Sequence, residues 1–122
     1  MHIPRLPDAE LMIMNIIWRC QDEVTSAQVT NMLENHKGWT ASTILTLLAR
    51  LAERGFLTVR KDGRHNVYRA AIAEADYVES ESKTFLEKFH GNSLTSLVAS
   101  LYSGRAIGED DLAELRRFID EK

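Results

Sequence analysis

The sequence of 122 residues predicts a mainly α-helical fold that contains one small β-hairpin. Between Thr40 and Gly55, apolar residues recur at i, i+3, i+4 and i+7, the spacing of a single helix face. Further along, Asp62-Gly63 separates two β-prone runs, and this dipeptide is a strong hairpin signal. The helical stripe consists of Ile44, Leu47, Leu48 and Leu51.

A first helix is expected from about Asp8 to Cys20. The Asp8 carboxylate can accept a hydrogen bond from a free N–H at the helix start. Leu11, Met14 and Trp18 recur at helical spacing, so we expect them to face the core.

A second, shorter helix is expected over residues 27–35. Thr25 or Ser26 supplies the hydroxyl of its N-cap. The side chains that we expect to face inward are Val29, Met32 and Leu33.

A turn over residues 35–38 leads into the helix with the clear stripe. Thr40 is expected to cap that helix and Gly55 to end it. The hairpin strands are then predicted at residues 56–61 and 66–69.

Three more helices, at residues 73–90, 93–102 and 109–121, carry apolar stripes of their own. The composition changes near residue 71, so we expect one domain over residues 1–71 and a helical one over 72–122. About fifty residues bury too little surface alone, and we therefore expect a homodimer through these helices. Its interface is predicted to contain Phe85, Phe89, Leu94, Leu97, Val98, Leu101, Leu112, Leu115 and Ile119.

The composition excludes several classes of protein. A hydrophobic fraction of 44% is too high for disorder, and the apolar runs are too short to cross a bilayer. The single cysteine, Cys20, cannot form an intramolecular disulfide, and no secretory signal is visible. We therefore expect a cytoplasmic protein without membrane insertion.

The sequence offers no catalytic or metal-binding motif. Its four histidines are scattered, and it has neither a glycine-rich phosphate loop nor a Gly-x-Ser-x-Gly elbow. The acids at residues 109–111 begin a helix, where the helix dipole accounts for them. We expect no enzyme activity, no metal and no cofactor.

The formal charge of −3 hides a basic segment at residues 37–69, which has seven bases and two acids. Two helices followed by a hairpin with basic residues at its tip is the order of a winged helix, whose second helix enters the DNA major groove. The outward face of that helix is expected to carry short side chains, which let a helix approach base edges. The expected DNA-contacting residues are Trp39, Thr40, Ser42, Thr43, Leu45, Thr46, Arg50, Arg60, Lys61, Arg64 and His65.

Other interpretations stay open. The short side chains can pack against the C-terminal helices, His65 can be a simple turn residue, and Trp39 can anchor the core. A winged helix released from DNA by a small ligand, or one that binds only proteins, also fits the pattern.

The sequence resembles the penicillinase-repressor and methicillin-resistance-repressor family over nearly its whole length. The most specific motif is Trp-Thr-x-x-Thr-Ile-x-Thr-Leu at residues 39–47. The other similar segments are residues 14–18, 48–51, 54–57, 66–68, 96–98 and 111–115.

This resemblance implies a bacterial winged-helix repressor that dimerises through its C-terminal helices. Such a repressor binds an inverted-repeat operator in double-stranded DNA, blocks a promoter, and controls beta-lactam resistance genes. Its release involves a membrane sensor-linked protease, and the cleaved Asn-Phe bond corresponds to Ser100-Leu101 here. The alternative is that Leu101 belongs to the interhelical core.

The chain departs from the family pattern at several positions. It has Ala41 and Ser42 where Pro and Lys are frequent, and Leu45 where Arg is frequent, which leaves its operator preference open. It also lacks the C-terminal Cys-x-Cys pair of the copper-responsive branch, which disfavours copper sensing.

Overall fold

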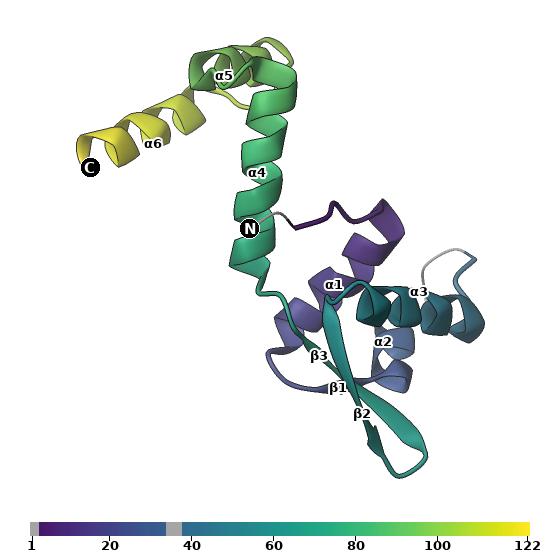
Figure 1. Ribbon diagram of the computed structural model, residues 1–122. Helices are drawn as coiled ribbons and strands as arrows, with labels where there is room; N and C mark the ends of the chain where they lie inside the picture. Colours follow the sequence, from purple (N-terminus) through teal and green to yellow (C-terminus); the bar gives the residue numbers. More distant parts are fainter. Residues whose placement is uncertain (1–2, 34–37) are drawn as a thin grey trace. The chain divides into compact units, whose positions relative to one another are not determined.

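The computed structural model describes residues 3–33 and 38–122, so most of the predicted turn at 35–38 lies outside the described residues (Figure 1). It confirms a mainly helical fold with a small antiparallel sheet. The elements in order are α1 (Asp8–Cys20), β1 (Val24–Thr25), α2 (Ser26–Met32), α3 (Ala41–Glu53), β2 (Leu57–Asp62), β3 (His65–Ala70), α4 (Glu74–His90), α5 (Leu94–Ser103) and α6 (Glu109–Asp120).

The chain divides into two compact units, Met1–Ser80 and Glu81–Lys122. The sequence places the division near residue 71. Tyr77 explains the difference, because its hydroxyl accepts a 2.9 Å hydrogen bond from the Leu6 backbone N–H. The Tyr77 ring also lies 5.9 Å from that of Phe56 and 5.8 Å from that of Trp18. The first turns of α4 therefore pack on the core of the first unit.

The predicted cap at Asp8 is wrong. α1 has Pro7 at its N-cap position and no side-chain cap, and Asp8 lies in the first turn, where its charge suits the helix dipole. The cap predicted for α2 is confirmed: the Thr25 hydroxyl accepts from the Gln28 N–H at 3.2 Å. The Gln28 side chain accepts in turn from the Thr25 N–H at 2.8 Å, which completes a capping box.

The predicted inward faces of α1 and α2 are confirmed in part, since Met14, Val29 and Leu33 are buried. Leu11 and Trp18 are only partly buried, because a neighbouring row of α1 residues faces the core instead. Met32 is 56% exposed, since Leu33 takes the inward position where α2 ends. The buried residues of α1 are Glu10, Ile13, Met14 and Ile17.

The sheet has the strand order β1-β3-β2, and both pairings are antiparallel. The hairpin of β2 and β3, called the wing below, is confirmed; its turn begins at Gly63, whose φ of +66° is the positive value that hairpin turns need. Sequence reasoning missed β1, in which Thr25 pairs with Val67. β1 ties the wing to the segment before α2.

Candidate nucleic-acid interface

The helix α3 presents one face to the core and the other to solvent. Its four predicted core residues are all buried, so the stripe fixes the orientation of the helix. Thr40 caps it as predicted, since the Thr40 hydroxyl accepts from the Thr43 N–H at 3.1 Å. The opposite side of α3 is thereby exposed.

Short side chains dominate the outward face of α3. Its central stripe, formed by Ser42, Thr46, Ala49 and Glu53, is exposed, as are the flanking residues Thr43, Leu45 and Arg50. The Thr46 hydroxyl donates to the Ser42 carbonyl at 3.1 Å, so its oxygen keeps lone pairs that can accept a further hydrogen bond. Such a hydroxyl can accept from the amino group of adenine or cytosine in the major groove.

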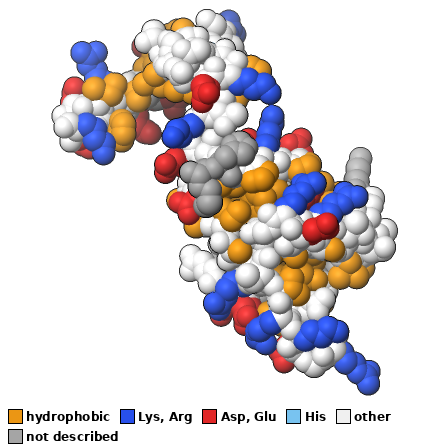
Figure 2. Space-filling view, viewed as in Figure 1, with side chains coloured by type: hydrophobic (Ala, Val, Ile, Leu, Met, Phe, Trp, Pro, Cys, Tyr) orange, Lys and Arg blue, Asp and Glu red, His pale blue; other side chains and the backbone are white. Residues whose placement is uncertain are grey.

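All three residues of the wing tip, by which we mean Lys61, Arg64 and His65, are exposed. Within the described part of the chain, no ion pair is recorded for Lys61 or Arg64. Figure 2 shows Lys and Arg side chains gathered at the end of the molecule where Figure 1 places the turn between β2 and β3. These charges are available to an anionic partner.

Arg60 differs from the wing tip. Its Nε donates to Glu23 Oε2 and its Nη2 to Glu23 Oε1, both at 2.7 Å. These hydrogen bonds keep the pKa of Glu23 below its ordinary value and raise that of Arg60. The sequence predicts Arg60 as a phosphate-binding residue, whereas the structure shows its guanidinium already bound to a carboxylate.

Two further arginines of the basic segment have acidic partners. Arg54 Nη1 lies 2.8 Å from Oε1 of Glu10, a residue of α1 that is 2% exposed. Arg69 Nη2 lies 3.6 Å from Asp22 Oδ1. The acidic partners of these arginines lie outside residues 37–69. The net charge counted for that segment is therefore larger than the positive charge available to a binding partner.

Sequence reasoning missed Glu10 and Glu23. A signal existed for Glu10, because it precedes Ile13, Met14 and Ile17 by three, four and seven residues and so shares their helix face. An acid on an apolar face predicts a buried ion pair. Glu23 gave no such signal, because its partner lies in β2.

Trp39 lies beside the interface. Its side chain is partly buried against the core of the first unit, which matches the core-anchor alternative. It also lines a shallow groove with residues of α1, including Leu11 and Asn15. Its proximity to Thr40 still places its backbone at the N-terminal end of α3.

The described residues contain no group of three or more His, Cys, Asp or Glu side chains that could hold a metal ion. Cys20 is a free, partly buried thiol. In that same part of the chain, no helix is both long and apolar enough to cross a bilayer. The acids at the start of α6 stabilise that helix, since Asp111 Oδ2 accepts a hydrogen bond from the Gly108 N–H at 2.8 Å.

Comparison with known proteins identifies the family. The model of the penicillinase repressor family matches residues 6–121. The chain belongs to this family. The penicillinase repressor of Bacillus licheniformis is 34% identical over 98% of this chain and 92% of its own length. The methicillin resistance regulatory protein MecI of Staphylococcus aureus strain N315 is 29% identical over 96% of this chain and 94% of its own length.

Two solved structures agree with the assignment of this chain to the penicillinase repressor family. The DNA binding domain of the repressor BlaI in solution has a TM-score of 0.55 and 38% identity, over 63% of this chain and 94% of that one. Monomeric BlaI of Bacillus licheniformis, in complex with the blaP half-operator, has a TM-score of 0.52 and 39% identity, over 62% of this chain and 90% of that one. The fold is therefore the winged helix that the sequence predicts.

Proposed function

We propose that this protein is a DNA-binding transcriptional repressor, without enzyme activity, that blocks a promoter by binding an inverted-repeat operator as a homodimer. The observation that carries the proposal is the exposed face of short side chains on α3, next to a wing tip whose lysine and arginine have no acidic partner among the described residues. A solved relative is bound to a half-operator, which supports the same role here. Because its proposed target is DNA, we place the protein in the cytoplasm. The genes that we propose it controls are beta-lactam resistance genes.

The two parts of the interface have different tasks in this proposal. Ser42, Thr43 and Thr46 meet base edges through their hydroxyls, and Leu45 meets thymine methyl groups. Arg50 is long enough to reach a guanine or a phosphate. The wing tip, with the backbone at Trp39 and Thr40, holds phosphate and adds affinity without sequence information.

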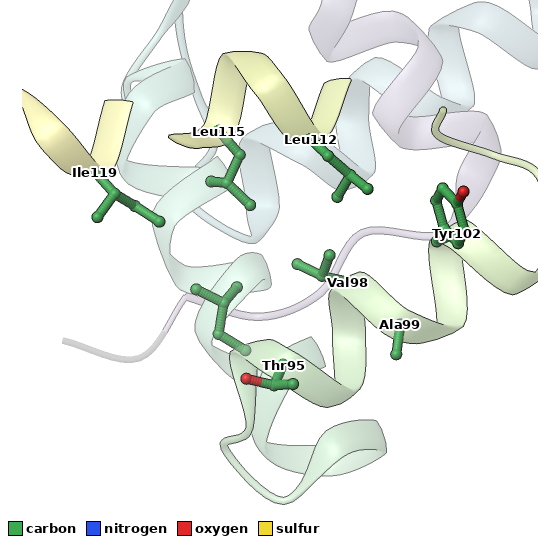
Figure 3. Close-up of a pocket in the computed structure, with 8 residues that line it drawn as sticks. Thr95, Val98, Ala99, Tyr102, Leu112, Leu115 and Ile119 are labelled. Atoms are coloured by element: carbon green, nitrogen blue, oxygen red, sulfur yellow. The ribbon is translucent and has the colours of Figure 1, made fainter. Parts of the chain in front are cut away.

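The second unit supports dimerisation. None of its residues, 81–122, is buried, and Phe89 is 59% exposed next to Phe85, with the ring centroids 5.0 Å apart. An apolar groove of about 380 Å³ separates α5 from α6, and Figure 3 shows side chains of both helices directed into it. Five predicted interface residues line this groove: Leu94, Val98, Leu112, Leu115 and Ile119.

A second copy is the occupant that we propose for these surfaces, because residues 81–122 include no buried side chain and leave most of their apolar area in water. The remaining predicted interface residues, Leu97 and Leu101, lie on α5 and are half-buried and exposed, respectively. Dimerisation would bring two recognition helices to successive major grooves.

Release by a sensor-linked protease is a further part of the proposal. The bond between Ser100 and Leu101 lies within α5, and the Leu101 carbonyl accepts from the Ala106 N–H at 2.9 Å where the chain turns toward α6. Cleavage there would separate α6 from the rest of the chain and remove one wall of the groove. The dimer, and with it tight operator binding, would be lost.

The experiment that tests the proposal is selection of binding sites from a random duplex library with the purified full-length protein, followed by a salt titration on the enriched site. We expect a two-fold symmetric site whose affinity falls steeply as salt rises. Failure to enrich any sequence would contradict the repressor function and favour a protein-binding or ligand-dependent winged helix.

A further inference from the structure

We propose that Glu23 is a positioning residue that holds Arg60 away from DNA, so that the wing binds phosphates through its tip alone. The inference rests on the proposed DNA binding and concerns which cations of the wing take part in it. It changes the role of Arg60, which the sequence predicts to bind phosphate.

The geometry of the pair carries the inference. A guanidinium binds a phosphate through a pair of parallel N–H groups, and it binds a carboxylate in the same way. Arg60 donates both Nε and Nη2 to Glu23 at 2.7 Å. The carboxylate therefore occupies the Nε–Nη2 edge, one of the two edges through which a guanidinium can bind a phosphate, and it compensates the positive charge of Arg60.

The sheet explains why Glu23 is in reach. Arg60 of β2 lies opposite Val67 of β3, and Val67 lies opposite Thr25 of β1. Residues opposite one another in an antiparallel sheet share a face, and Glu23 precedes Thr25 by two residues. The Arg60 side chain thus extends across β3 toward the segment that leads into β1.

A second positive charge lies near Glu23 on the same face of the sheet. Arg69 of β3 acts electrostatically on the Glu23 carboxylate and lies 3.6 Å from Asp22. Asp22 and Glu23, which come just before β1, therefore compensate the positive charges of Arg60 and Arg69.

The cations of the wing thus divide into two groups. Arg60 and Arg69 have acidic partners, whereas Lys61 and Arg64 have none among the residues that the structure describes. Affinity for any DNA sequence rises with the number of phosphates that a protein neutralises. An internal counter-ion at Arg60 limits that number and leaves a larger share of the binding to α3.

The test is a salt titration of operator binding by the full-length protein and by Glu23→Gln, Arg60→Gln and the double variant. Glu23→Gln keeps the shape of the side chain, removes its charge and frees Arg60. We expect the slope of log K against log salt to become steeper by about 0.9 for each chain bound, which is about 3.5-fold more loss of affinity between 50 and 200 mM salt. Arg60→Gln should weaken binding with an unchanged slope, because it exposes the Glu23 charge, and the double variant should have the wild-type slope.

Glu79→Gln is the matched control, because it removes the same charge at an exposed residue of α4 for which the described part of the chain shows no ion pair, and it leaves the Arg60 pair intact. It should leave the slope unchanged. If Arg60→Gln makes the slope shallower by about 0.9, Arg60 already binds phosphate and the inference is wrong. If wild-type protein binds with a steep slope but Glu23→Gln has the same slope, this inference alone fails, whereas absence of binding by the wild type overturns the proposed function as well.

Discussion

Replacing Arg54 by methionine should destabilise the first unit strongly, because it leaves a buried carboxylate without its donor. Glu10 is 2% exposed, and Arg54 Nη1 lies 2.8 Å from its Oε1. Breaking a fully buried ion pair costs about 3–5 kcal/mol. The Arg54 side chain is 43% exposed, so water can replace part of the lost interaction, and we expect a cost of about 2 kcal/mol.

Thermal and urea unfolding of the full-length protein at neutral pH, followed by circular dichroism, measures this loss. A cost of about 2 kcal/mol lowers the Tm of a unit of this size by roughly 8–16 °C. Arg50→Met is the matched control, because Arg50 lies on α3, one turn before Arg54 at the end of that helix, is exposed, and has no ion pair in the part of the chain that the structure describes.

The double variant Glu10→Leu with Arg54→Met should recover most of the lost stability, since no charge then stays buried without a partner. A Tm for Arg54→Met within about 2 °C of the wild-type value corresponds to less than about 0.5 kcal/mol, and it would show that Glu10 does not depend on Arg54.

The remaining predictions concern DNA, the dimer and pH. Arg64→Ala should weaken binding to all sequences alike and make the salt slope shallower, whereas Thr46→Ala should change the sequence enriched in site selection. A changed sequence for Arg64→Ala and an unchanged one for Thr46→Ala would contradict the proposed interface. Leu115→Asp should weaken self-association at least about tenfold in sedimentation, while Ala113→Asp, on the exposed side of α6, should leave it unchanged. The difference in Tm between wild type and Glu23→Gln should be constant from about pH 8 to about pH 5.5 and vanish as pH falls through the lowered pKa of Glu23, because a depressed carboxyl pKa contributes stability only above it. A difference that persists at about pH 2 would show that the Glu23 charge is not its source.

The elements with strong local signals were predictable from the sequence. The stripe of α3 fixes both the helix and its outward face, because one repeat at helical spacing determines which residues are buried. The hairpin around Gly63 depends on two neighbouring residues and needs no tertiary information. Both features belong to the candidate interface, so much of that interface could be predicted.

The features that sequence reasoning missed depend on contacts between distant segments. β1 has two residues, too few for any periodicity, and it exists because β3 offers it a partner. The Arg60–Glu23 pair joins residues 37 positions apart. The division between the units follows from Tyr77, whose hydroxyl partner is 71 residues away.

In the proposed complex α3 reads the operator sequence, while the wing tip holds phosphate. Competition between the selected operator and a scrambled duplex of the same length, at physiological salt, tests it most directly. We expect a preference for the operator of roughly a thousandfold or more, which is the range of specific DNA-binding proteins. Equal affinity for the two duplexes would contradict it, because the outward face of α3 would then not read bases.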